Sequence, residues 1–228
     1  MDLGRKCGAG GSKNGWMYGV KDAKKQCRGN GLMKGTLDYY NENAKDYINS
    51  TKNVEFAGMQ DKFLGFLKPG DRVLDFGCGS GRDAKYFLEK GFRVDAVDGA
   101  IEFVKLASEY TGIQVKQMLF QDLDAVGIYD GIWACSSILH LPGKKLEDVL
   151  GKMAKALVSR GIAYISFKYG DWEGERNGRY FTDMTEEKMK CMLDKTDIFL
   201  IEDMWVTSDV RLGREDEQWL NLILRKKK

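Results

Sequence analysis

The chain has 228 residues, and 43% of them are hydrophobic, which supplies the core of one domain of ordinary size. Its 36 Lys and Arg residues nearly balance its 34 Asp and Glu residues, so the net charge of +2 disfavours nucleic acid or anionic lipid as a partner of the whole surface. No apolar run approaches the ~18 residues of a membrane span, and the N-terminus lacks the apolar segment of a signal peptide.

The cysteines and the single histidine indicate a reduced, metal-free protein. The 5 cysteines form no CxxC pair, and an odd number cannot all pair internally, so we expect free thiols and a cytoplasmic location. A zinc site would need scattered cysteines together with His140, so we expect no metal. For the oligomeric state we expect a monomer or a homodimer.

The first 32 residues differ in composition from the rest of the chain. They are rich in glycine and lysine, a composition that orders poorly, and they lead into Met33, which would itself make a plausible start. We therefore predict that residues 1–32 are a tail or an over-extended start, and that residues 33–228 form the domain.

Regular elements are predicted from about Leu37 onward, where apolar residues recur with helical or strand spacing. In chain order these are helices at 37–51 and 56–67, a strand at 72–76, a helix after the glycine-rich loop that ends at Gly91, a strand at 92–97, a helix at 101–110, strands at 113–119 and 131–135, a helix at 144–158 and a strand at 161–167.

The order of these elements predicts the fold. Strands that alternate with helices imply a parallel sheet with right-handed crossovers. The C-terminal part differs, because a helix at 185–193 precedes two strands, 198–206 and 219–225, that have no helix between them and should be antiparallel. We predict an α/β, doubly wound, mostly parallel seven-stranded sheet with one antiparallel strand near its C-terminal edge.

The strongest motif is the loop Gly77-Cys78-Gly79-Ser80-Gly81, which directly follows the strand at 72–76. In a dinucleotide-binding loop the third glycine would fall at position 82, which is Arg82, and no Gly-Lys-Ser/Thr follows as in a phosphate-binding loop. The acid Asp75 can take an ammonium, and the backbone amides at the start of the next helix can take a carboxylate. The loop therefore predicts an amino-acid-like ligand rather than a pyrophosphate.

Two further acids follow successive strands. Asp98 ends the second strand, where a carboxylate can accept hydrogen bonds from both hydroxyls of a ribose, and Asp122 follows the third strand, where it can accept from an adenine amino group. Each acid alone also fits a helix N-cap or a turn. Three acids that each lie near the carboxyl end of a successive strand predict one shared site.

These stretches resemble the class I S-adenosylmethionine-dependent methyltransferases, and most of all the small-molecule branch that includes tellurite-resistance and quinone-biosynthesis-like enzymes. The resemblance runs from about Thr36 to the C-terminus and rests on VLDFGCGSGR, AVD, QDL and YDGIWACSSILHLP. The resemblance implies that the methionine part of the cofactor is contacted by Asp75, Gly77, Gly79 and Arg82, and the ribose by Asp98. It places Gln121, Asp122 and Leu123 around the adenine and Ala134 beside the cofactor. It also implies a helix folded over the cofactor that carries Tyr39 and Tyr47, with Tyr40 directed toward the acceptor. The tyrosines also fit simple packing of that helix.

The acceptor side is less well defined. His140 is the only imidazole available as a general base, although a ligand contact or a structural role fits it equally. Residues 168–181 are predicted to be a substrate lid, with Arg179 and Tyr180 as leading acceptor contacts and Arg211 and Arg214 as lesser ones. There is no Asn/Asp-Pro-Pro-aromatic motif and no Pro-Cys nucleophile, which disfavours enzymes that modify nucleic acids.

The sequence therefore predicts transfer of a methyl group from S-adenosylmethionine to a small-molecule acceptor. Three alternatives stay open at this point: a methyltransferase acting on tRNA or protein, a nicotinamide-dependent oxidoreductase, and a non-catalytic cofactor-binding module.

Overall fold

The computed structural model describes residues 31–211 and 213–228 of the chain. The predicted tail therefore lies outside the described residues, apart from Gly31 and Leu32, which belong to the first helix, and its boundary stays a prediction. The elements of the N-terminal half are α1 (Gly31–Glu42), α2 (Ala44–Thr51), α3 (Ala57–Leu64), β1 (Arg72–Phe76), α4 (Arg82–Glu89), β2 (Arg93–Asp98), α5 (Ile101–Thr111), β3 (Lys116–Gln117) and the 3-10 helix η1 (Phe120–Asp122).

The C-terminal half adds the strands that complete the sheet and a separate hairpin. Its elements are β4 (Tyr129–Ala134), the 3-10 helix η2 (Ile138–His140), α6 (Gly143–Ala156), β5 (Leu157–Lys168), β6 (Glu173–Arg176), β7 (Arg179–Thr182), α7 (Glu186–Thr196), β8 (Phe199–Ser208) and β9 (Gln218–Lys226).

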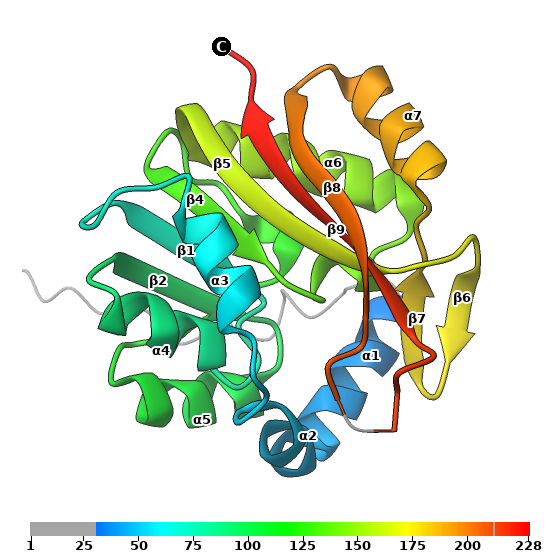
Figure 1. Cartoon of the computed structure of the whole chain (residues 1–228). Helices are drawn as coiled ribbons and strands as arrows, with labels where there is room; N and C mark the ends of the chain where they lie inside the picture. Colours follow the sequence, from blue (N-terminus) through cyan, green and yellow to red (C-terminus); the bar gives the residue numbers. More distant parts are fainter. Residues whose placement is uncertain (1–30, 212) are drawn as a thin grey trace, which may run out of the picture.

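Seven strands form one sheet in the order β3-β2-β1-β4-β5-β9-β8 (Figure 1). The pairs from β3 to β5 are parallel, whereas β9 runs antiparallel to both of its neighbours. The predicted sheet is thus confirmed, including its single reversed strand next to the C-terminal edge. Strand order reverses between β1 and β4, and ligands of doubly wound sheets bind at such a switch point, beyond the carboxyl ends of the strands.

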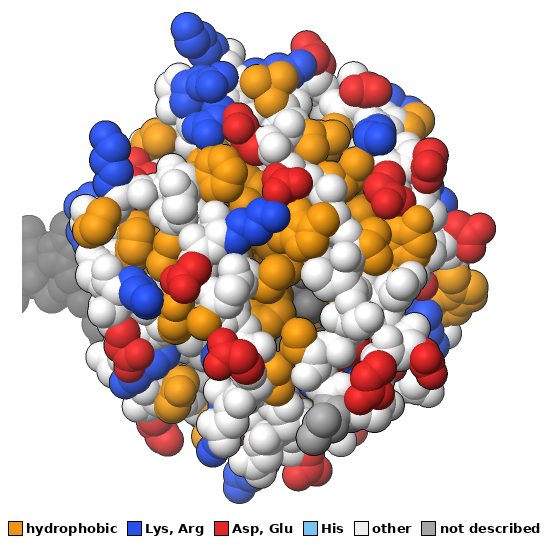
Figure 2. Space-filling view, viewed as in Figure 1, with side chains coloured by type: hydrophobic (Ala, Val, Ile, Leu, Met, Phe, Trp, Pro, Cys, Tyr) orange, Lys and Arg blue, Asp and Glu red, His pale blue; other side chains and the backbone are white. Residues whose placement is uncertain are grey.

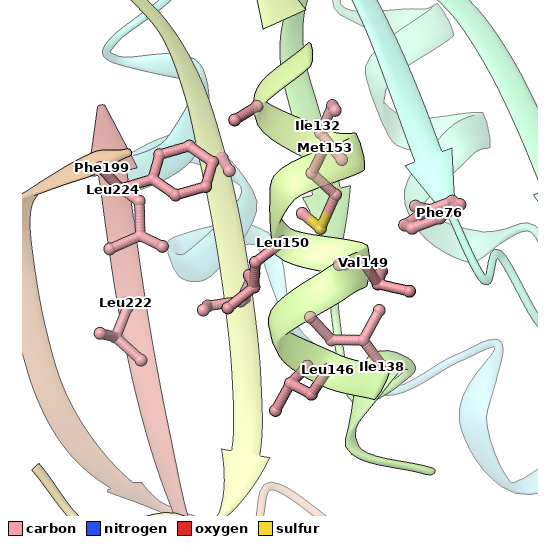
Figure 3. Close-up of a cluster of buried hydrophobic side chains, with 14 of the residues drawn as sticks. Phe76, Ile132, Ile138, Leu146, Val149, Leu150, Met153, Phe199, Leu222 and Leu224 are labelled. Carbon is pink, nitrogen blue, oxygen red and sulfur yellow. The ribbon is translucent and has the colours of Figure 1, made fainter. Parts of the chain in front are cut away.

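The central strands are buried on both faces, so neighbouring residues along one strand pack into different cores. Leu74 and Ile132 lie in the larger core, which α6 and α7 cover, whereas Val73 and Trp133 lie in the core beneath α3 and α4. Figure 3 shows the larger core, with Leu146, Leu150 and other residues of α6 directed at the sheet strands. This packing on both faces fixes the strand tips around which the site is built.

Three predicted elements have different limits in the structure. The helix predicted at 37–51 is two helices that meet at Asn43, whose side-chain amide donates to the Tyr39 carbonyl at 2.8 Å. The strand predicted at 113–119 lies at one edge of the sheet and pairs with β2 only through Lys116 and Gln117. The predicted lid over 168–181 contains the hairpin β6–β7, which turns at Asn177-Gly178, where both residues have positive φ.

Candidate functional site

A cavity of about 240 Å³ lies at the switch point of the sheet, beyond the carboxyl ends of β1, β2, β4 and β5. Its remaining walls come from α1, α2, β7 and the segment that joins β8 to β9. Hydrophobic side chains gather across the middle of the molecular face shown in Figure 2, while side chains of both charges are interspersed over it. The residues that line the cavity include apolar side chains, such as Phe103 and Leu139, and polar groups at the strand tips, which is the usual composition of a small-molecule site.

The glycine loop forms the floor of the cavity, and its glycines have different roles. Gly77, Gly79 and Gly81 all have positive φ, between 52° and 88°. A Cβ atom on Gly77 would lie 2.5 Å from the Cβ of Ser137, and one on Gly81 would lie 2.8 Å from Thr111. At Gly79 the nearest atom would be 3.9 Å away, so this glycine leaves open space above the loop. Two glycines permit close packing, and the third leaves the backbone accessible to a ligand.

Asp98 links the loop to the tip of β2. Its carboxylate accepts hydrogen bonds from the backbone N–H groups of Gly79 at 2.9 Å and Ala100 at 2.8 Å, and the residue lines the cavity. Burial raises the pKa of Asp98 to about 6. A carboxylate has about four acceptor positions, so two bonds to the backbone leave capacity for hydroxyl groups of a ligand.

Asp75 lies behind the loop rather than in the cavity wall. It is buried and accepts a hydrogen bond from the backbone N–H of Ala84 at 3.0 Å, which fixes the first turn of α4. Burial, and then the neighbouring carboxylate of Asp83, raise the pKa of Asp75 well above its usual range. Asp75 therefore does not line the cavity, where the predicted contact to a ligand ammonium would require it to lie.

A buried polar cluster around Asp83 stands beside the loop, and the sequence analysis missed it. The Asp83 carboxylate accepts from Gln60 at 2.6 Å, from the indole of Trp133 at 2.8 Å and from Arg82 at 2.7 and 3.0 Å. The Arg82 guanidinium also lies over the ring of Phe56 and lines the cavity. The sequence did not predict this role for Asp83, because acids are common in the first turn of a helix and two of its partners, Gln60 and Trp133, are distant in the sequence.

His140 and Tyr40 form a hydrogen-bonded pair in the cavity wall. The Nδ1 atom of His140 lies 2.6 Å from the carbonyl of Tyr180, and its Nε2 atom lies 2.8 Å from the Tyr40 hydroxyl. A carbonyl only accepts, so this network assigns the hydrogen to Nδ1, and Tyr40 then donates to Nε2. Burial lowers the His140 pKa to about 4. The imidazole is therefore neutral near pH 7, and its basic nitrogen is already occupied by Tyr40.

The residues expected around the adenine lie outside the cavity wall. Gln121 has a buried side-chain oxygen without a hydrogen-bond partner. Asp122 is exposed, whereas Leu123 and Ala134 are packed in the larger core. None of these four residues lines the cavity, whose wall here is formed by the preceding residues Met118, Leu119 and Phe120.

The remaining predicted contacts separate into residues inside and outside the cavity. Tyr40, Tyr47 and Arg179 line it. Tyr39 does not, and its ring instead supports the Arg179 guanidinium at 4.4 Å. The Tyr180 side chain donates to Glu173 at 2.6 Å within the β6–β7 hairpin, so only its backbone reaches the site. This correction follows from strand alternation, which turns neighbouring side chains of β7 to opposite faces.

Several residues on the acceptor side were not predicted. Cys135, Ser136 and Ser166 line the cavity at the ends of β4 and β5, and the backbone N–H of Ser136 donates to the Ser166 hydroxyl at 2.8 Å. Burial raises the pKa of Cys135 to about 12, so this thiol stays protonated and is not a nucleophile near pH 7. Tyr164, Lys168 and Asn221 also line this side. No local motif gathers these residues, since they come from strands far apart in the sequence.

Residues 31–211 and 213–228 contain neither a metal-binding cluster nor a helix able to span a membrane. No group of three or more His, Cys, Asp and Glu side chains in this part of the chain is placed to hold a metal ion. None of the helices described there has the length and apolarity needed to cross a membrane.

Comparison with known proteins finds similarity to methyltransferases. Residues 73–161 match the family described as "Methyltransferase domain". Over 108 residues the chain is 33% identical to 2-methyl-6-phytyl-1,4-hydroquinone methyltransferase of Synechocystis sp., a match that covers 44% of this chain and 34% of that protein. Over 94 residues it is 30% identical to an S-adenosyl-L-methionine-dependent Diels-Alderase of Talaromyces variabilis, covering 36% of this chain and 32% of the relative.

Among solved structures, the fold is similar to that of the 1,6-didemethyltoxoflavin-N1-methyltransferase of Burkholderia thailandensis, with a TM-score of 0.70, 22% identity, and coverage of 86% of this chain and 88% of that one. The chain spans about a third of the length of the two curated relatives that it matches. Residues 73–161 therefore match a methyltransferase domain, and the fold of the chain is similar to that of solved methyltransferases.

Proposed function

We propose that this protein transfers a methyl group from S-adenosylmethionine to a small-molecule acceptor. The observation that carries the proposal is the position of Asp98 and the glycine loop together in one cavity at the switch point of the sheet. A carboxylate at the tip of β2 suits the two hydroxyls of a ribose, and the open space above Gly79 suits an amino-acid chain that follows the loop. Arg82 is not a glycine, which disfavours the nicotinamide alternative.

The chain's own residues fit the other parts of the cofactor. Arg82 faces the cavity beside the loop and supplies a cation for the methionine carboxylate, while Asp75 acts indirectly by fixing the start of α4. Gln121 directly follows Phe120 of the cavity wall, and its buried side-chain oxygen lacks a hydrogen-bond partner, so a small side-chain movement would let it accept from the adenine amino group. When bound, S-adenosylmethionine supplies a methyl group that its sulfonium already activates.

The remaining task of the protein is to align the acceptor and to exclude water. The rings of Tyr40 and Tyr47 line the cavity and favour a cationic sulfonium at their faces. Tyr40 donates its hydrogen to His140 and also interacts with Arg179, so its oxygen is held in a fixed position in the cavity wall. A neutral, occupied His140 positions Tyr40 rather than acting as a free base.

The acceptor is proposed to be small because the site is a cavity of about 240 Å³. Figure 2 shows positive and negative side chains interspersed over one face, where a tRNA would need a continuous basic surface. One relative is named as a Diels-Alderase, so cofactor binding alone does not establish methyl transfer.

Labelled methyl transfer tests this proposal. The full chain is incubated with S-[methyl-¹⁴C]adenosylmethionine and, separately, with the low-mass metabolites, the tRNA and the protein of its source cells. We expect label in the low-mass fraction, and Asp98→Ala serves as the matched inactive control. Label recovered in tRNA or protein, and none in metabolites, would contradict a small acceptor.

A further inference from the structure

The walls of the cavity divide into two halves according to the strands that supply them. The tips of β1, β2 and β3 contribute the glycine loop, Asp98 and Phe120, which are the residues proposed for the cofactor. The other half comes from β5, β7, β9 and the segment between β8 and β9. This second half faces the position of the acceptor.

The acceptor half carries more positive than negative charge. Lys168, Arg179, Arg211 and Arg214 line it, and the only carboxylate among its described lining residues is Asp209. Asp209 pairs with Arg211, and Glu217, outside the cavity, pairs with both Lys168 and Arg214. Three cations therefore share two carboxylates.

Arg179 is the cation left over. It has no ion-pair partner within the described part of the chain, and its Nε atom is buried without a hydrogen bond. The guanidinium lies close to three aromatic rings, with its central carbon 4.4 Å from the ring centre of Tyr39, 5.7 Å from that of Tyr40 and 5.1 Å from that of Phe181. A desolvated N–H without an acceptor is costly, so a residue kept in this state indicates a missing anionic partner.

The neighbouring cations reinforce this reading. Burial lowers the pKa of Lys168 to about 8, and Arg211, Arg214 and Arg176 act in the same direction against the opposing effect of Asp209. The acceptor half therefore has a positive potential that a bound anion would relieve.

The apolar residues of the same half define the rest of the ligand. Tyr164, Phe181 and Trp219 present aromatic rings to the cavity, together with the aliphatic side chain of Val210. Walls of this kind favour a flat apolar body. The cavity of about 240 Å³ restricts that body to a small one.

We propose that the acceptor is a small aromatic molecule that carries a carboxylate, and that Arg179 binds this carboxylate. The inference rests on the proposed function, since it names the substrate class of the same cavity. A planar guanidinium can form paired hydrogen bonds to a carboxylate, and the neighbouring rings of Tyr39 and Phe181 pack against that of Arg179.

The test compares matched carboxylates and carboxamides. Binding of 1-naphthoate and 1-naphthamide, and of benzoate and benzamide, to the full chain saturated with S-adenosylhomocysteine is measured by calorimetry. We expect at least one carboxylate to bind about tenfold more tightly than its amide, because a charge-assisted pair is stronger than a neutral one. In Arg179→Gln this advantage falls to about twofold or less, and Arg179→Lys restores part of it.

Arg93→Gln is the matched control, because it removes the same charge at the other end of the sheet, where Arg93 donates to Gly70. The advantage should persist in that variant. Equal affinity for both members of each pair in the wild type, or an advantage that survives in Arg179→Gln, would overturn the inference.

S-adenosylhomocysteine affinity is measured first in every variant, which confirms folding and separates the two proposals. Failure of the wild type to bind it would refute the proposed function. If instead Arg179→Gln weakens S-adenosylhomocysteine but not 5′-methylthioadenosine, Arg179 holds the carboxylate of the cofactor, and the acceptor inference is wrong.

Discussion

Asp98 should make nucleoside binding depend on pH. Burial raises its pKa to about 6, from an ordinary value of 3.8. Ribose hydroxyls donate hydrogen bonds to the carboxylate form, so a bound nucleoside should return the pKa toward its ordinary value. Below pH 6 the free protein holds a proton that it must lose on binding, and affinity therefore falls as the pH falls through 6.

The size of the effect follows from the two pKa values. At pH 5 about nine-tenths of the free protein is protonated at Asp98, so affinity should be roughly tenfold lower at pH 5 than at pH 8, which corresponds to about 1.4 kcal/mol. The affinity for 5′-methylthioadenosine would be measured by calorimetry. This ligand lacks the amino-acid part of the cofactor, so the protonation state of Asp75 should not affect its binding.

The variant Asp98→Asn removes the titrating group and keeps the shape of the side chain. Its affinity for 5′-methylthioadenosine should be independent of pH between 5 and 8. Wild-type affinity that does not change over this range, or an equal slope in Asp98→Asn, would show that Asp98 does not contact the ribose.

Three further predictions concern the residues around the loop. Gly77→Ala should lower the free energy of unfolding, measured by urea titration, by roughly 2–4 kcal/mol, because the added Cβ atom would lie 2.5 Å from the Cβ of Ser137. Gly70→Ala, at a similar φ but with open space around it, should lower it by only about 1–2 kcal/mol. The imidazole of His140, the only histidine, should show a hydrogen on Nδ1 and none on Nε2 in ¹⁵N NMR from pH 8 down to about 5.5, and protonation near 6.5 would contradict its burial. Trp133→Phe removes a donor to buried Asp83 and should lower the free energy of unfolding by about 1–3 kcal/mol, measured by urea titration.

Local patterns were sufficient to predict the sheet and the loop. The strand at 72–76 and the glycine spacing lie within ten or so residues of each other, and Asp98 occupies a strand tip whose position follows from the alternation of strands and helices. The hairpin β6–β7 also had a local signal, since Asn177-Gly178 is a preferred two-residue turn, and it was overlooked within a segment predicted to be a lid.

Contacts between distant segments were not predictable in the same way. The environment of Asp83 needs Gln60 from α3 and Trp133 from β4, and the unpaired state of Arg179 is visible only once every nearby carboxylate has been placed. The same limit applies to His140, where the sequence offers a base but only the contact with Tyr40 shows that its nitrogen is occupied.

Thermal unfolding with S-adenosylhomocysteine, and separately with NAD and NADP, tests the central claim most directly. A ligand at about 100 times its dissociation constant stabilises by about 2.7 kcal/mol, which raises the melting temperature of a chain of this size by roughly 5–10 °C. The proposed site predicts this rise with S-adenosylhomocysteine alone, and its loss in Asp98→Ala. No rise with S-adenosylhomocysteine, or a rise with NAD or NADP instead, would contradict the account.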